Sequence, residues 1–181
     1  KRLGYTYIDS GAMYRAITLY MLDHEVNIND EVAVAQALEA ITIDIKTGEN
    51  GNVIFLNNTD VSATIRTMHV ANKVSEVAAI GIVRKKAVAQ QRALGAKKGV
   101  IMDGREIGSV VFPDAELKIF MTADPEVRVK RRFDELKATQ PDITMEEVRA
   151  NLSHRDHIDT TRAIDPLVQT EDAIVLDNSF M

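Results

Sequence analysis

Val100-Ile101-Met102-Asp103-Gly104-Arg105-Glu106-Ile107-Gly108 is the most informative segment of this 181-residue chain. Its first three residues form a short apolar run without polar alternation, which is typical of a parallel strand covered on both faces. Charged residues and glycines follow at once, and such residues at a strand end often belong to a functional site. The alternative is a plain turn, because Asp-Gly pairs are common turn formers. We favour the functional interpretation, since the charged turn closes directly on a strand that we expect to be buried.

Strand and helix patterns alternate on either side of this segment. Short apolar or aromatic runs at residues 5–8, 117–121 and 173–176 predict further strands. The helices predicted from apolar spacing and capping signals are Ala12–Asp23 with Ser10 as its cap, 31–40, two over 70–98 broken near Gly81, 125–138, and one that starts in a capping box at Thr144. Strands separated by helices predict an α/β fold with a mainly parallel sheet.

A β-hairpin interrupts this alternation. Residues 41–45 and 53–56 run apolar or alternate, and the turn signal Gly48-Glu49-Asn50-Gly51 lies between them. Because predicted helices flank the hairpin, we expect it to be an appendage rather than part of the central sheet.

Composition narrows the class of ligand. The chain is 45% hydrophobic, which is enough for one globular domain, and its formal net charge is −5. An acidic chain with no long apolar run predicts no nucleic-acid partner and no membrane partner. It contains no cysteine, which excludes disulfides and thiolate chemistry and fits a reducing cytoplasm. The four histidines show no metal-ligand spacing, so we predict no protein-built metal site.

Asp9-Ser10-Gly11 is a second polar cluster at a predicted strand end, and Arg15 follows one helical turn later. In α/β sheets, ligands bind at the carboxyl ends of the strands, so this cluster is predicted to lie near Asp103 and Arg105. Asp-Ser-Gly is also an ordinary turn sequence, and for this cluster alone both interpretations stay open.

A third cluster, Arg155-Asp156-His157-Ile158-Asp159-Thr160-Thr161-Arg162, has helical spacing. Positions i, i+4 and i+7 place Arg155, Asp159 and Arg162 on one face. Planar guanidinium groups bind phosphate oxygens well, so the cluster suggests a small phosphorylated ligand. Taken alone, a solvated face with weak salt bridges explains the pattern equally, as it does for the charges of residues 128–132.

Three motifs in order resemble the bacterial cytidylate kinase family. The first is Tyr7-Ile8-Asp9-Ser10-Gly11-Ala12-Met13-Tyr14-Arg15-Ala16, the second is Asp103-Gly104-Arg105-Glu106-Ile107-Gly108, and the third is Arg155 to Arg162 followed by Asp165-Pro166-Leu167. The likeness covers nearly the whole chain and includes the hairpin insertion.

The resemblance implies a three-layer α/β/α P-loop nucleoside monophosphate kinase fold with a parallel sheet. It implies one kinase domain over residues 1–181, with a core of about residues 1–29, 82–129 and 165–181, a monophosphate-binding insertion of about residues 30–81 that bears the hairpin, and a helical lid of about residues 130–164. It also implies transfer of the γ-phosphoryl group of ATP, with Mg²⁺, to CMP or dCMP. We expect small nucleotides as its only partners, and a monomer.

The resemblance assigns roles by motif position. It implies that Arg15, Arg105 and Arg162 bind the acceptor phosphate beside Ser10, and that Arg155 and Asp159 face the sugar. It implies that Ser75, Arg84 and Glu106 read the cytosine edge, and that Arg131 and Arg132 of the lid cover ATP. The catalytic set implied is Asp103, Arg105, Arg155 and Arg162.

Two departures from the family pattern stand out. No G-x-x-x-x-G-K-[ST] sequence occurs in the chain, and the family's final helix is also missing, so we expect the chain to be incomplete at both ends and inactive with ATP as it stands. Position 106 is Glu where many relatives have Asp. The extra methylene moves the carboxylate by about 1.5 Å, so the base contact of Glu106 is the weakest of the implied roles.

Two other functions remain open at this stage. One is another small-acceptor P-loop kinase of the UMP or shikimate type, against which Ser75 and Arg84 argue weakly. The other is a non-catalytic nucleotide-binding module that has lost its P-loop.

Overall fold

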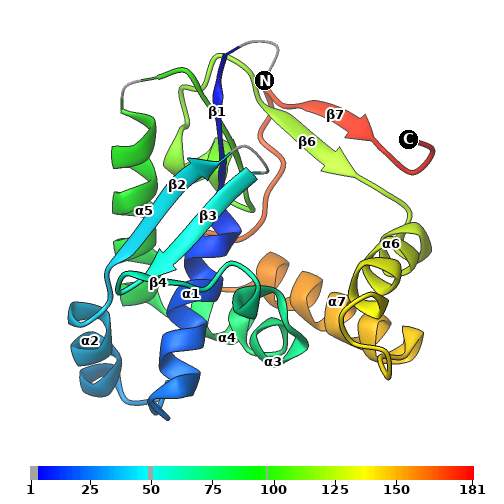
Figure 1. Ribbon diagram of the computed structural model, residues 1–181. Helices are drawn as coiled ribbons and strands as arrows, with labels where there is room; N and C mark the ends of the chain where they lie inside the picture. The colour runs from blue at the N-terminus through cyan, green and yellow to red at the C-terminus, as the bar shows by residue number, and fades with distance from the viewer. Residues whose placement is uncertain (1–3, 49–50, 97) are drawn as a thin grey trace.

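A computed structural model describes residues 4–48, 51–96 and 98–181 (Figure 1). The elements in chain order are β1 (Thr6–Asp9), α1 (Ser10–Asp23), α2 (Glu31–Glu39), β2 (Ile43–Gly48), β3 (Gly51–Leu56), β4 (Thr59–Asp60), the 3₁₀ turn η1 (Thr64–Arg66), α3 (Met68–Ala71), α4 (Val74–Ala78), α5 (Gly81–Gly95), β5 (Val100–Asp103), the π-helical turn η2 (Ile107–Val111), β6 (Ile119–Thr122), α6 (Pro125–Lys137), α7 (Met145–Thr161) and β7 (Ile174–Asp177). No helix among these described residues is both long and apolar enough to cross a membrane.

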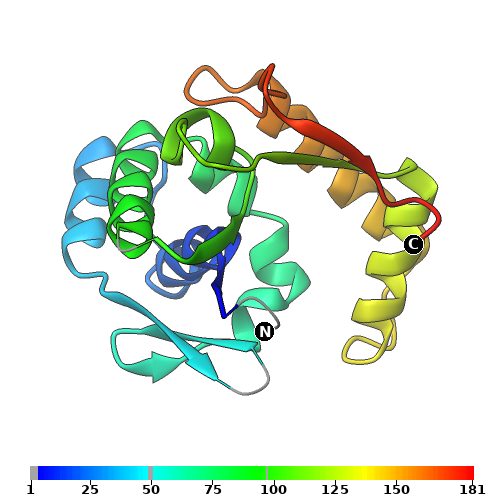
Figure 2. The ribbon, with the colours of Figure 1, turned by 90° about the horizontal axis from the view of Figure 1, so that it is seen from above.

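The predicted α/β class with parallel strands is confirmed, and the strands are arranged as separate pairs. β1 pairs with β5 and β6 pairs with β7, both in parallel, while β2, β3 and β4 form an antiparallel sheet. The expectation that the parallel strands are covered on both faces is wrong, because Ile101, Ile119 and Ile174 are 50%, 51% and 60% exposed. The physical reason is that the two pairs share no edge: β6 and β7 lead away from β1 towards α6 (Figure 2).

Helix α1 forms the centre of the core. Ala12, Met13, Ala16 and Ile17 are 0 to 1% exposed, and the helix packs against α3, α4 and α5. Asp9 caps it by accepting a hydrogen bond from the Ala12 amide, so the predicted capping role of Ser10 is wrong. A carboxylate at this position satisfies a free helical N–H and also complements the helix dipole. The cap places the start of α1 at the carboxyl end of β1.

The segment from α2 to α4 carries the predicted hairpin. β2 and β3 pair in antiparallel register from Ile43↔Leu56 to Gly48↔Gly51, and the short β4 adds a third strand. The residues of the predicted turn, 49 and 50, lie outside the described part of the chain. The first helix predicted for residues 70–98 is in fact two short helices, α3 and α4, while the predicted break near Gly81 is confirmed.

Helices α6 and α7 form a hairpin with a small core of its own, built from Val129, Leu136, Ile143 and Val148. The predicted capping box at Thr144 is confirmed, with Glu147 as its partner. Met68 of α3 packs against this core, so the hairpin touches the segment from α2 to α4 (Figure 1). The division into core, insertion and lid at the residues given above stays a prediction.

Candidate functional site

A cavity of about 120 Å³ lies where the carboxyl ends of β1 and β5 meet the end of α7. The residues that line it are Asp9, Ser10, Gly11, Tyr14, Arg15, Val74, Ser75, Ala78, Asp103, Gly104, Arg105, Glu106, Arg155, Asp159 and Arg162. The three sequence motifs therefore converge on one cavity. Arg15, Arg105 and Arg162, which are far apart in the chain, all contribute to it, as the sequence predicted.

The start of α1 supplies a paired arginine. Arg15 Nη2 donates to Asp9 Oδ2 at 2.7 Å, and the same carboxylate caps the helix through Oδ1. Arg15 Nε is buried without a hydrogen-bond partner among the described residues. Gly11 lies against this arginine, since a Cβ there would come within 3.0 Å of Arg15 Nη1. Asp9 thus orients one edge of the guanidinium and leaves other N–H groups available to a ligand.

Ser10 joins the start of α1 to the turn after β5. Its hydroxyl donates to the Asp103 carbonyl at 2.5 Å, and the residue is 2% exposed. A side chain at Gly104 would collide with Ser10 Oγ and with Ile107. This position therefore favours glycine because the Ser10 and Ile107 side chains pack directly against its backbone.

Glu106 is the centre of a buried ionic network. It is 3% exposed; Arg84 Nη2 lies 2.7 Å from Oε1, and Arg162 Nη2 lies 3.1 Å from Oε2. The Tyr14 hydroxyl also donates to Oε1, at 2.7 Å. A buried carboxylate needs such partners, since an unpaired charge in the interior is strongly unfavourable.

Arg84 lies behind Glu106 rather than on the cavity wall. Its side chain is 1% exposed, its Nε donates to Asp165 Oδ2 at 3.0 Å, and its Nη1 donates to the Ala78 carbonyl at 3.1 Å. Of the predicted acceptor-site residues, Arg84 is the one that does not line the cavity, whereas Ser75 does.

Asp159 extends the network to the turn after β5. Its Oδ1 lies 3.2 Å from Arg162 Nη1, and its Oδ2 lies 3.0 Å from Arg105 Nε. Arg162 caps the C-terminal end of α7 with extended backbone, so the predicted helical face covers only Arg155 and Asp159. The three side chains still meet, because the chain turns back at Arg162 towards Glu106.

Arg155 differs from the other arginines of the cavity. It forms no ion pair with a carboxylate among the described residues, and its Nε is buried without a partner. Burial, and secondarily the positive charge of Arg105, lower the pKa of Arg155 to about 10. An anion bound beside Arg155 would offset both effects.

The carboxyl group of Asp103 lies at the rim beside Asp9. Partial burial, and then the negative charge of Asp9, raise the pKa of Asp103. Partial burial of the Tyr7 side chain, and then the negative charge of Asp103, raise the pKa of Tyr7 to about 12. Asp9 and Asp103 are register partners at the ends of β1 and β5, so two carboxylates lie at this rim, and that of Asp9 is paired with Arg15.

Arg131 and Arg132 do not line the cavity. Arg131 donates to the Asn178 side chain at 3.0 Å and to the Asn178 carbonyl at 2.8 Å, near the end of the described chain. Arg132 pairs with Glu135 at 2.8 Å and donates to the Arg66 carbonyl at 3.3 Å. The structure thus brings the acceptor-site residues together and leaves the two predicted lid residues apart from them.

Sequence reasoning quoted Tyr14 and Asp165 within the motifs but assigned neither of them a role. Tyr14 is four residues after Ser10 on α1, so helical spacing could have placed it on the cavity face. No spacing signal indicates that Asp165, three residues beyond Arg162, contacts Arg84.

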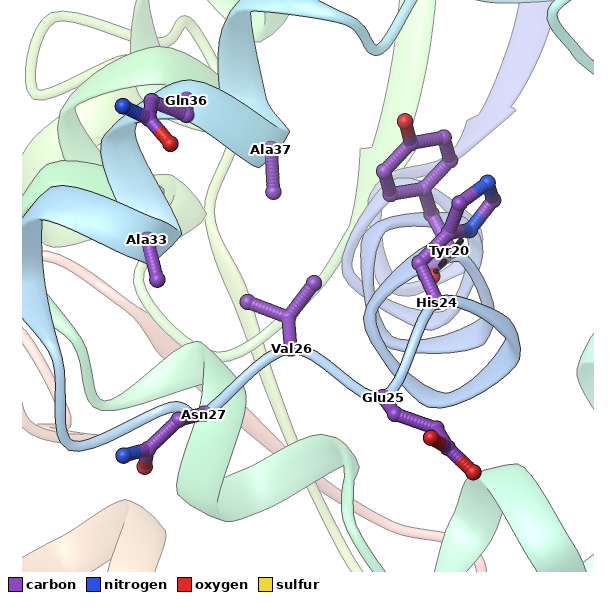
Figure 3. A pocket seen from close by; sticks show the side chains of 8 residues that line it. All are labelled: Tyr20, His24, Glu25, Val26, Asn27, Ala33, Gln36 and Ala37. Carbon is purple, nitrogen blue, oxygen red and sulfur yellow. Dashed lines mark hydrogen bonds between the residues drawn. The ribbon is translucent and has the colours of Figure 1, made fainter.

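A second, more open cavity of about 430 Å³ lies at the far end of α1 beside α2 (Figure 3). Tyr20 and His24 stack there with ring centroids 3.9 Å apart, opposite Ala33 and Ala37. Among the described residues, neither an arginine nor a lysine lines it. This cavity therefore lacks the cationic groups that a phosphate requires.

The chain matches the cytidylate kinase family over residues 1–181. It is 47% identical to a cytidylate kinase of Bacteroides fragilis and 50% identical to one of Parabacteroides distasonis, in each case across 100% of this chain and 81% of the relative. It is 44% identical to a cytidylate kinase of Porphyromonas gingivalis with the same coverage. With the three motifs gathered in one arginine-lined cavity, these matches show that the chain belongs to the cytidylate kinase family.

Proposed function

We propose that this protein transfers the γ-phosphoryl group of ATP to CMP or dCMP, giving CDP or dCDP, in the cytoplasm. The observation that carries the proposal is the set of guanidinium groups around one small cavity, supplied by Arg15, Arg105, Arg155 and Arg162. Its curated relatives are named cytidylate kinases, which agrees with this acceptor.

The acceptor phosphate binds between the arginines. Arg105 and Arg162 are oriented by Asp159, and Arg15 is oriented by Asp9, so each keeps some N–H groups for phosphate oxygens. Arg155, which has no carboxylate partner in the described part of the chain, contacts the sugar and the group in transfer. Phosphoryl transfer depends mainly on positioning and on positive charge around the reacting oxygens, and this arrangement supplies both.

The cytosine base binds beside Ser75 and Glu106. A carboxylate has about four acceptor sites; on Glu106, Tyr14 and Arg162 donate hydrogen bonds, and Arg84 lies 2.7 Å from Oε1 as an ion-pair partner. The remaining site accepts the exocyclic amine of cytosine. Uracil presents a carbonyl oxygen at that place, which the carboxylate repels, so CMP is preferred over UMP.

Mg²⁺ accompanies ATP in this proposal. The described residues contain no group of three or more His, Asp or Glu side chains able to hold a metal ion, which fits an ion bound mainly to nucleotide oxygens and water. Asp103 would complete its coordination, because its carboxylate lies at the end of β5 on the lining of the cavity. When bound, Mg²⁺ neutralises charge on the transferring phosphates.

Arg131 and Arg132 cover ATP only if the α6–α7 hairpin moves, since their present partners lie outside the cavity. Closure of such a segment over the bound substrates would exclude water and limit ATP hydrolysis.

A coupled assay of the complete gene product across the common nucleoside monophosphates tests the proposal. We expect CMP and dCMP to be phosphorylated with a kcat/KM well above that for UMP or AMP. Equal or better use of UMP, or turnover only with a small hydroxyl acceptor such as shikimate, would indicate another small-acceptor kinase. ATP-independent binding of CMP without turnover would indicate a non-catalytic nucleotide-binding module.

A further inference from the structure

We propose that Tyr14 is a specificity-determining positioning residue, whose hydroxyl holds the Glu106 carboxylate in the one orientation that favours cytosine over uracil. The inference rests on the proposed function, because it concerns the same acceptor site.

The contact between the two residues joins α1 to the turn after β5. The Tyr14 hydroxyl donates to Glu106 Oε1 at 2.7 Å, and the partners are 92 positions apart in the chain. Tyr14 is 7% exposed and Glu106 is 3% exposed, so water competes little for this hydrogen bond. Hydrogen bonds to a buried charged group are among the stronger ones in proteins.

Three side chains meet the Glu106 carboxylate, and Tyr14 is the uncharged one among them. Arg162 meets Oε2, whereas Arg84 and Tyr14 both meet Oε1. The Arg84 guanidinium also lies 5.6 Å from the centroid of the Tyr14 ring, within the range of a cation–π contact. Tyr14 thus contacts two of the three residues predicted to read the base, Glu106 through its hydroxyl and Arg84 through its ring.

The phenol acts only as a donor. Burial, and secondly the negative charge of Glu106, raise the pKa of Tyr14 above its ordinary value. The hydroxyl therefore keeps its proton at every pH at which the enzyme works. A neutral donor fixes the carboxylate without adding another positive charge beside Arg84 and Arg162.

The glutamate explains why such a restraint matters. Compared with aspartate, Glu106 has one more rotatable bond, so its carboxylate has more ways to turn. Discrimination against uracil depends on an acceptor oxygen that cannot turn away from the uracil carbonyl. A carboxylate held by hydrogen bonds from Tyr14 to Oε1 and from Arg162 to Oε2, with Arg84 as an ion-pair partner, meets that requirement.

Tyr14→Phe in the complete protein tests the inference, because it keeps the ring and its contact with Arg84 and removes only the hydroxyl. We expect the KM for CMP to rise by about tenfold, the loss of one hydrogen bond to a charged group, while kcat stays within about twofold. The ratio of kcat/KM for CMP to that for UMP should fall, and the KM for ATP should not change. Tyr20→Phe is the matched control: it lies on the same helix, faces the distant cavity, and its hydroxyl makes no hydrogen bond to the described residues. We expect the Tyr20→Phe variant to keep the wild-type KM for CMP and the wild-type preference for CMP over UMP.

A double-mutant cycle with Glu106→Asp separates positioning from packing. The shorter carboxylate is withdrawn by about 1.5 Å, so the Tyr14 hydroxyl cannot reach it. We expect Tyr14→Phe to add no further loss of CMP preference in the Glu106→Asp background.

Two results would overturn the inference. One is a Tyr14→Phe variant that loses thermal stability but keeps the KM for CMP and the CMP preference, which would make Tyr14 a packing residue. The other is a full, multiplicative effect of Tyr14→Phe in the Glu106→Asp background. Failure of the proposed function would look different, because the wild-type protein itself would then show no preference for CMP.

Discussion

Arg162 and Glu106 form a buried ion pair, with Arg162 Nη2 3.1 Å from Glu106 Oε2 and each side chain 3% exposed. The pair joins the end of α7 to the turn after β5, and it continues to Asp159 on one side and to Arg84 on the other. An alternating series of charges therefore fixes Arg105 and Arg162 before any ligand binds. Such pre-organisation reduces the cost of ordering side chains upon binding.

Arg162→Ala should lower kcat/KM for CMP by at least about 100-fold, which corresponds to the loss of a charge-assisted contact of roughly 2–3 kcal/mol. Steady-state kinetics of the complete protein with CMP as the varied substrate measures this change in kcat/KM. Arg149→Ala is the control, since Arg149 lies on α7, the helix that Arg162 follows, and pairs there with the exposed Glu126 and Glu146. An unchanged value for Arg162→Ala would remove this residue from the site.

Glu106→Gln should lower the free energy of unfolding by about 3–5 kcal/mol, because it leaves Arg84 and Arg162 buried with one anionic partner fewer. Urea unfolding followed by circular dichroism measures the change. The same substitution at Glu116, which is 81% exposed and pairs with Lys98, should have almost no effect. Equal stabilities of the two variants would show that the network contributes little to the fold.

Glu106→Asp should change the preference between CMP and UMP more than it changes the KM for ATP. The shorter side chain keeps the charge but moves the carboxylate away from the base by about 1.5 Å. Parallel kinetics with CMP, UMP and ATP as the varied substrate measures both effects. A fixed CMP-to-UMP ratio would mean that Glu106 does not read the base.

Asp103→Asn should abolish most activity and raise the melting temperature at neutral pH. The pKa of Asp103 is raised, so its charged form is less favourable in the folded than in the unfolded state, and this cost is fully present above the folded pKa. The cost disappears as the pH falls through the raised pKa towards the ordinary value of about 4. Thermal melts of the wild type and of Asp103→Asn at a series of pH values measure this cost. We expect the stability gain of Asp103→Asn over the wild type to shrink as the pH falls, and a gain that grows on acidification would contradict this expectation.

Gly104→Ala should destabilise the fold by about 1–3 kcal/mol, the usual cost of overpacking, since the new Cβ collides with Ser10 Oγ and Ile107. Ser10→Ala in the same protein should restore part of this loss by removing the hydroxyl. Gly108→Ala is the control, because its nearest neighbour is the flexible Lys118 side chain at 3.2 Å. Thermal melts rank the variants, and equal melting temperatures for the two alanine variants would argue against close approach at Gly104.

The elements near the site follow well from sequence, because local signals specify them. Asp103-Gly104 after an apolar run marks the end of β5, and Thr144 with Glu147 marks the start of α7. Convergence of the first two motifs also follows, since the carboxyl ends of parallel strands lie at one edge, whereas the place of the third motif, on α7, comes from the family resemblance. Periodicity does not show that α3 and α4 are separate helices, because their apolar positions continue across the break.

Contacts across the chain could not be predicted from local patterns. The Tyr14 hydrogen bond to Glu106 and the Asp165 contact with Arg84 join distant segments, so no spacing rule indicates them. The positions of Arg131 and Arg132 depend on how the α6–α7 hairpin lies, which the sequence motif alone does not specify. The exposure of Ile101 and Ile119 likewise depends on the separation of two strand pairs.

The most direct test of the central claim is a calorimetric titration of the protein with CMP and with cytidine, which differ only in the phosphate. If Arg15, Arg105 and Arg162 surround one anion, CMP should bind at least about 100-fold more tightly than cytidine, in line with charge-assisted hydrogen bonds, and Arg162→Ala should remove most of that difference. Equal affinity for CMP and cytidine would contradict the account.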